Sequence, residues 1–134
     1  MLRRCANHRT HMSPVERWAG ERFCQLWNRC STRGTDAQAG RIFLGLLQHY
    51  CEPHRLYHNI GHIGACLRQL DLALDQVADP MAVELAVWFH DVIYDPHAPD
   101  NERQSAEYWR THANGSMAPK LVDKVHDLIL LTIH

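Results

Sequence analysis

The apolar run at residues 86–89, which reads AVWF, constrains the fold more than any other part of the sequence. A helix that is apolar on nearly every face has to be covered by protein on every side. We therefore expect the helix that begins at Asp79-Pro80 to lie at the centre of the molecule. His90 and Asp91 follow this run directly, so the sequence places an ionisable pair at the end of a buried helix.

The other helices follow from apolar side chains that recur at the spacing of one helix face. Together with the central helix, they are expected near residues 14–30, 36–50, 59–77, 80–90, 101–113 and 119–134. Ser13 and either Thr35 or Asp36 are suitable N-caps for the first two. No segment reads convincingly as a strand. The sequence therefore predicts an all-α fold, a compact and non-repeating array of about six helices.

Length and charge limit the other possibilities. The chain has 134 residues, which indicates one domain. We expect residues 1–12 to be a loose N-terminal tail and residues 13–134 to form the helical domain. A net charge of -1 provides no basic field for a nucleic acid polymer or a membrane surface. No run approaches the roughly 18 apolar residues of a membrane span, and no secretory signal is present.

The sequence contains five cysteines, and none of them forms a C-x-x-C pair. Cys24, Cys51 and Cys66 fall in apolar helical patterns. We interpret the cysteines as reduced side chains of a cytoplasmic protein.

Histidine is abundant, and two of the eleven histidines, His58 and His62, are four residues apart. On a helix this spacing puts both imidazoles on one face, where they can approach one ion. Asn59 provides a second interpretation, because as the helix cap it leaves His58 just outside the helix. A third interpretation is that the two histidines are surface residues without a partner.

The pair His90-Asp91 also has two interpretations. A carboxylate next to the core needs a cation, a metal or strong hydrogen-bond donors. A divalent metal would satisfy Asp91 and the neutral imidazole of His90 together. Alternatively, His90 caps the C-terminus of its helix, where the dipole favours an imidazolium.

A third polar cluster follows in the loop at residues 95–102. Asp100 or Asn101 is a good N-cap for the next helix, and acidic residues suit a helix start. The simple interpretation is therefore capping and a stiff loop. The functional alternative is that Asp95 or Glu102 borders a site and positions water or substrate.

Taken together, the order His, then His-Asp, resembles the HD superfamily of metal-dependent phosphohydrolases. The resemblance is closer to a bacterial group of HD-type hydrolases, and it covers residues 55–134. The matching motifs are Tyr57-His58-Asn59-x-x-His62, then Trp88-Phe89-His90-Asp91-Val92-Ile93-Tyr94-Asp95-Pro96, then Asp100-Asn101-Glu102 and Ser105-Ala106. The first motif is also similar to one in the cyclic-nucleotide phosphodiesterases.

The resemblance implies a role for each matching residue. His62, His90 and Asp91 would be metal ligands, and His58 would donate a proton to the leaving oxygen. For Arg55, which has no role in the resemblance, we suggest a contact with a phosphate. A mixed set of nitrogen and oxygen ligands suits Mn, Zn, Fe, Co or Ni better than Mg or Ca.

The chain departs from the HD pattern at one point, because no residue matches the fourth ligand, an Asp on a later helix. In the resembled group that Asp lies beyond an element like Thr132-Ile133-His134, so we expect the C-terminal part of the domain to be incomplete. A fragment, a partner chain that completes the site, and a degenerate member of the family remain alternative explanations. Apolar surface left uncovered would favour a homodimer, which sedimentation at tens of micromolar tests.

The function implied by the resemblance is a metal-dependent phosphohydrolase acting on a nucleotide or other small phosphoester. One alternative is a catalytically silent HD-fold module that binds a metal, a ligand or a partner. Another is a redox protein with a di-iron centre, which would need further His and Asp ligands that the sequence does not place.

Overall fold

The structure, a computed structural model, describes residues 12–132, and its regular elements in that range are helices joined by loops. The helices are α1 (Pro14–Cys30), α2 (Asp36–Tyr50), α3 (Ile60–Leu72), the short 3-10 helix η1 (Leu74–Gln76), α4 (Pro80–Phe89), α5 (Asn101–Ala113) and α6 (Pro119–Leu130). The only β-type contact within 12–132 is an isolated antiparallel bridge between Ser31 and Met117. The prediction of an all-α array of about six helices is confirmed.

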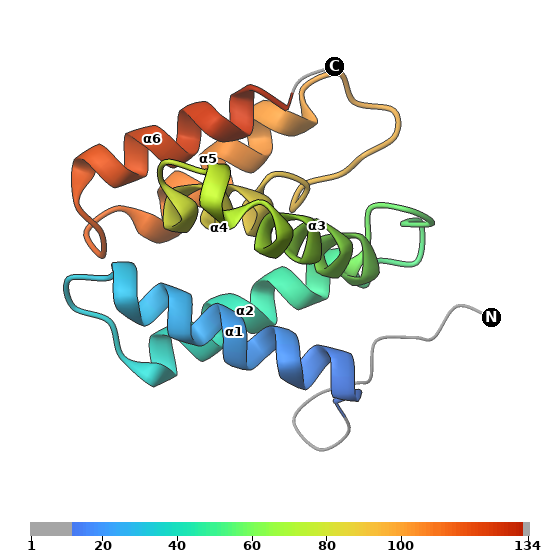
Figure 1. Cartoon of the computed structure of the whole chain (residues 1–134). Helices are drawn as coiled ribbons and strands as arrows, with labels where there is room; N and C mark the ends of the chain where they lie inside the picture. The colour runs from blue at the N-terminus through green and yellow to red at the C-terminus, as the bar shows by residue number, and fades with distance from the viewer. Residues whose placement is uncertain (1–11, 133–134) are drawn as a thin grey trace.

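Helix α4 occupies the centre of the array, as its apolar sequence predicted. It packs against α1, α3, α5 and α6, while α1 pairs with α2 and α5 pairs with α6. In Figure 1, α1 and α2 lie side by side on one side of the molecule, and α5 and α6 lie on the other. The end of α4 that carries His90 and Asp91 therefore sits between these two layers.

Aromatic side chains hold the C-terminal end of α4 in place. Trp88 and Phe89 are fully buried, and so are Phe23 of α1 and Trp109 of α5. The ring of Phe23 meets Trp88 edge to face at 5.3 Å, and Trp109 meets Phe89 in the same way at 5.0 Å. Such pairs contribute about 0.5–1.5 kcal/mol each beyond the area they bury. The backbone just before His90 is thus fixed by the core.

Side-chain caps define where most helices begin. Ser13, Thr35, Asn59 and Asp79 each accept a hydrogen bond from the backbone N–H three residues further on. This confirms Ser13 as a cap and chooses Thr35 over Asp36. Because Asn59 caps α3, His58 lies outside the helix, which was one of the alternatives that the sequence left open.

Several predicted boundaries need correction. Helix α3 ends at Leu72 instead of near residue 77, because Leu72 and Leu74 are exposed and no core remains for the last turn to pack on. The chain tightens there into η1. Met12 packs against the core, so it does not belong to a loose tail. Helix α6 ends at Leu130. Residues 1–11 of the predicted tail and residues 133–134 of the helix predicted for 119–134 lie outside the described residues.

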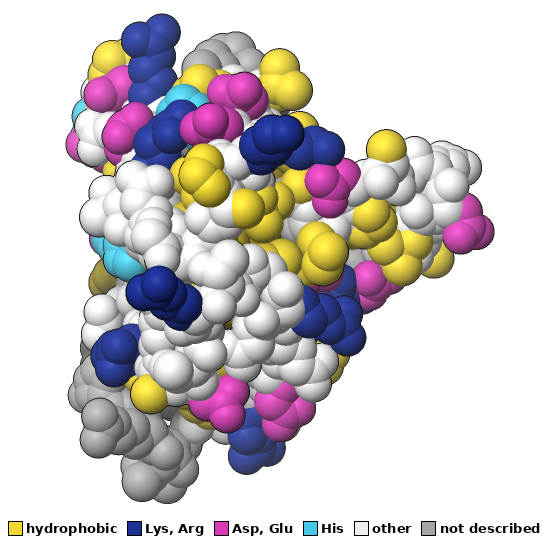
Figure 2. Space-filling model, turned by 90° about the vertical axis from the view of Figure 1, so that its left-hand side faces the viewer, with side chains coloured by type: hydrophobic (Ala, Val, Ile, Leu, Met, Phe, Trp, Pro, Cys, Tyr) yellow, Lys and Arg dark blue, Asp and Glu magenta, His cyan; other side chains and the backbone are white. Residues whose placement is uncertain are grey.

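The interpretation of all five cysteines as reduced is also wrong in part. Cys24, Cys30 and Cys66 have free thiols, whereas Cys51 is disulfide-bonded. In the described part of the chain, no helix has both the length and the apolar character needed to cross a bilayer. Figure 2 shows one face of the molecule, on which basic, acidic and hydrophobic side chains are mixed and no extended basic area is present.

Candidate metal centre

Three segments bring ionisable side chains to one place beside the start of α3. His62 lies in the first turn of α3, and His58 precedes the Asn59 cap. His90 is the C-cap of α4, and Asp91 follows it in the turn after the helix. The packing of α3 against α4 therefore joins two motifs that are about thirty residues apart in the sequence.

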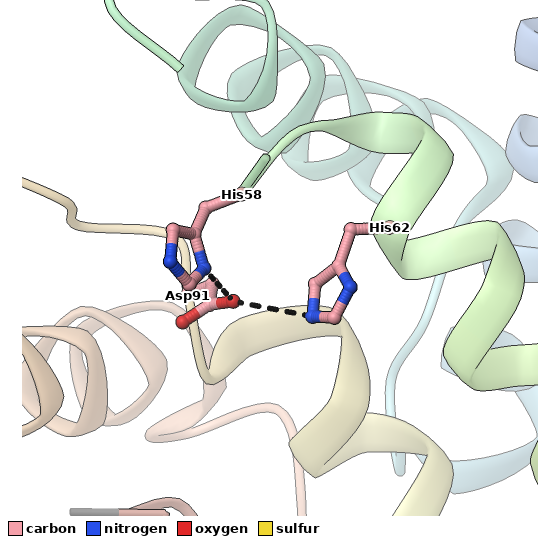
Figure 3. Close-up of side chains that lie close together, drawn as sticks. All are labelled: His58, His62 and Asp91. Atoms are coloured by element: carbon pink, nitrogen blue, oxygen red, sulfur yellow. Dashed lines mark hydrogen bonds and ion pairs between the residues drawn. The ribbon is translucent and has the colours of Figure 1, made fainter. Parts of the chain in front are cut away.

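One carboxylate oxygen of Asp91 is the centre of this cluster. Its Oδ2 lies 2.9 Å from Nδ1 of His58, 3.2 Å from Nε2 of His90 and 3.7 Å from Nε2 of His62. Figure 3 shows His58 and His62 on either side of the Asp91 carboxylate. The ligand atoms of His58, His62 and Asp91 all lie within 4.8 Å of one another, so this group could hold a metal ion.

The two imidazole nitrogens of His90 contact different groups. Nδ1 lies 2.7 Å from the carbonyl oxygen of Val87, to which it can only donate. This contact caps the end of α4, so the capping interpretation of His90 is correct. It also leaves Nε2 of the neutral ring with a lone pair on the side of Asp91. A backbone partner on the second nitrogen is the usual way in which a metal-binding histidine is oriented.

The charges in the cluster are coupled. Burial would raise the pKa of Asp91, but hydrogen bonds and charges from His90 and His58 hold it well below its usual value. Burial would lower the pKa of His90, yet its hydrogen bond with Asp91 raises it overall. Burial lowers the pKa of His62. At neutral pH the cluster thus contains a firmly ionised carboxylate and at least one imidazole that favours the neutral, ligand form.

The walls of the cluster contain three side chains that the sequence did not single out as site residues. The ring centre of Tyr94 lies 4.5 Å from that of His58, and the ring centre of Tyr57 lies 4.7 Å from that of His62. Sγ of Cys66 lies 3.6 Å from Nε2 of His62. Cys66 is four residues after His62, so helical spacing alone predicts that the two share a face.

The suggested phosphate contact of Arg55 is wrong. The Arg55 side chain is fully buried, and each N–H group of its guanidinium is hydrogen-bonded within the protein. A ligand in the site has no access to it. Arg55 therefore has a role inside the fold instead of a role in binding substrate.

The loop that follows Asp91 supports the simple interpretation of residues 95–102. The Asp95 carboxylate accepts a hydrogen bond from the backbone N–H of His97. The Asn101 side chain bonds both the N–H and the carbonyl of Asp95. Asp100 occupies the cap position of α5 without bonding its backbone. These contacts stiffen the loop, and none of them reaches the cluster.

A fourth acidic ligand is not supplied by the described part of α6. Asp123 pairs with Arg110 at 2.9 Å, and Asp127 lies 3.3 Å from Nδ1 of His126. Both carboxylates are exposed on the outer side of the helix.

Comparison of the chain with models of protein families, with curated proteins and with solved structures finds no match. The resemblance to the HD superfamily therefore remains a prediction from the motifs. What stands on geometry is narrower: two histidines and one aspartate are arranged closely enough to hold a metal ion, with His90 beside them.

Proposed function

We propose that the protein is a metal-dependent phosphohydrolase acting on a nucleotide or another small phosphoester. The observation that carries the proposal is the convergence of three imidazoles on one oxygen of Asp91. Within residues 12–132, no ion pair joins this carboxylate to an arginine or a lysine. Asp91 is partly buried, and its ion-pair partners among the described residues are imidazoles, which can exchange their protons for a metal ion.

The donor set fits a divalent transition metal. Imidazole nitrogens with one carboxylate suit Mn, Zn, Fe, Co or Ni, and the orientation of His90 by Val87 presents its Nε2 as a ligand. We assign His62, His90 and Asp91 as the ligands. His58 is as close to Asp91 as either of them, so a set that includes His58 is the structural alternative.

A metal bound there would lower the pKa of coordinated water and neutralise charge on phosphoryl oxygens. In hydrolysis, a water oxygen forms a bond to phosphorus while the ester P–O bond breaks, and the leaving oxygen needs a proton. We assign this proton transfer to His58. Its side chain is one-third exposed, and Asp91 holds its Nδ1, so Nε2 remains for the leaving group.

The test is hydrolysis of a generic aryl phosphate with each of the five metals in turn. We expect metal-dependent turnover in the wild type and none in Asp91→Ala. The exposed Asp123→Ala is a matched control on α6 and should retain the wild-type rate. No turnover with any of these metals would refute the hydrolase assignment.

A silent ligand-binding module is the second candidate, and one observation favours it. An apolar pocket of about 230 Å³ adjoins the cluster and includes His90 and Cys66 in its wall. Such a pocket can bind a small apolar group without any chemistry. Metal uptake without turnover would support this candidate, and a visible absorption band from bound iron would support the di-iron alternative.

A further inference from the structure

Arg55 joins the two segments that carry the cluster. Its Nη1 donates to the carbonyl oxygen of Asp91 at 2.6 Å and to that of His58 at 3.2 Å. Its Nη2 donates to the carbonyl oxygen of Val92 at 2.6 Å. One guanidinium therefore holds the backbone on both sides of the His58–Asp91 pair.

The buried cation has its own supports. Oε1 of Glu52 lies 2.9 Å from Nε and 2.8 Å from Nη2, which supplies the counter-charge. The guanidinium carbon lies 5.3 Å from the ring centre of Tyr50 and 5.7 Å from that of Tyr94. Aromatic faces attract a desolvated cation, so both rings favour this one position of the side chain.

Backbone hydrogen bonds do not connect the two segments that carry the cluster. Within residues 12–132, none joins the segment 52–59 to the segment 88–94. Side chains make the connections: the hydroxyl of Tyr50 donates to the carbonyl of Trp88 at 2.6 Å, and His54 reaches the carbonyl of Tyr94 on the exposed side. Of these side chains, only Arg55 contacts the backbone of both His58 and Asp91.

The planar guanidinium is the reason that arginine occupies this position. Its N–H groups point in fixed directions, so it can bond several carbonyls and a carboxylate at once. The ammonium group of lysine would present its donors from a single nitrogen. It would preserve the charge without being able to reach all the partners.

We propose that Arg55 is a positioning residue. Through the backbone of Asp91 and Val92 it places the Asp91 carboxylate and thereby sets the affinity of the site for metal, and through the backbone of His58 it fixes that imidazole relative to Asp91. This inference rests on the proposed metal site, but it concerns the protein before any ion binds. Arg55 acts through backbone carbonyls and does not touch the ion or the substrate.

The experiment is a titration with Co²⁺, followed by its visible absorption, on the full chain. We expect Arg55→Gln to bind Co²⁺ about 10–100-fold more weakly than the wild type, as is usual when a partner behind the ligands is lost. Arg55→Lys should recover part of that loss. The matched control is Arg22→Gln, which breaks an arginine cluster away from the site and should leave both the affinity and the absorption band unchanged.

Thermal melts followed by circular dichroism show which variants are folded. If Arg55→Gln does not fold, Arg55→Lys alone decides the matter: weaker Co²⁺ binding or a shifted band supports the proposal. Wild-type affinity and band in any folded Arg55 variant overturn it, as does an equal loss of affinity in Arg22→Gln.

Hydrogen exchange of the metal-free protein separates this inference from the proposed function. If the wild type binds no Co²⁺, the metal site is refuted. The positioning role is then tested by the hydrogen-exchange rates of the backbone amides of residues 58–62 and 91–93. Faster exchange there in the folded Arg55 variant, and not in Arg22→Gln, supports the role, whereas equal exchange refutes it.

Discussion

Two acidic clusters connect helices α3 and α4, and they are neutralised in different ways. In the first, Arg22 of α1 binds Asp71 at 2.8 Å and Glu84 at 2.7 Å. In the second, Asp91 has three imidazoles around one oxygen, and no arginine or lysine of residues 12–132 pairs with its carboxylate. Both clusters hold the same helices, but only the second has partners whose charge changes near neutral pH.

This difference separates two acids paired with a permanent cation from an acid that, under the proposed function, can bind a metal ion. An arginine remains charged at every pH at which proteins are folded. A metal ion would therefore have to displace a permanent positive charge from Asp71 and Glu84 in order to bind them. Arg55 bonds the backbone carbonyls of Asp91 and Val92 and the carboxylate of Glu52, and not the carboxylate of Asp91. The fold thus provides positive charge behind the site while the carboxylate itself stays accessible to another ion.

The largest expected effect is on metal content, when one aspartate of each cluster is replaced by alanine. Asp91→Ala should abolish metal uptake, while Asp71→Ala should leave about one transition-metal ion per chain, because only Asp91 belongs to a ligand group. Plasma mass spectrometry of the untagged proteins measures the content. Equal metal content in the two variants would remove the distinction between the clusters.

The next effect concerns the role of His58 within the second cluster. If His58 donates the proton, His58→Ala should keep its metal and lower turnover by about 10²–10⁴-fold. The comparison is with His62→Ala, which should lose the metal itself. Loss of metal from His58→Ala would instead reassign His58 to the ligand set, which the spacing of the described site allows.

The pH dependence should distinguish the metal-free from the metal-bound protein. Because the pKa of His90 is raised in the fold, its pairing with Asp91 stabilises the metal-free protein fully below about pH 6.5, and this contribution is lost as pH rises through the raised pKa. Metal affinity should change in the opposite direction, because His90 must lose its proton to bind. Calorimetric melts of both forms test this, and parallel pH trends would contradict it.

The smallest effect is expected in the arginine cluster. Glu84→Gln removes one partner of Arg22 and should lower the free energy of unfolding by about 1 kcal/mol, because the pair is partly exposed and screened by water. Urea unfolding at low and high salt measures this. Metal content should not change, and a loss of metal in this variant would show that the two clusters are coupled.

The extent to which the site was predictable varies by residue. The spacing of His58 and His62 and the position of His90-Asp91 after an apolar run marked these four residues as candidates, and the resemblance to the HD superfamily implied their roles. The sequence did not decide whether His90 caps its helix or faces Asp91, and the structure shows both, because the two ring nitrogens point in different directions. Arg55 was misassigned, because nothing in its local sequence indicates that it is buried.

The sequence by itself determined that six helices form and that Ser13 caps the first of them, because apolar spacing and capping depend on residues within a few positions of one another. It also determined that α4 is central, since a helix that is apolar on nearly every face has to be buried. Only the tertiary structure decided which atoms meet. The 2.6 Å contact between Arg55 and the carbonyl of Asp91 depends on the packing of the segment between α2 and α3 against the end of α4, which no local pattern specifies.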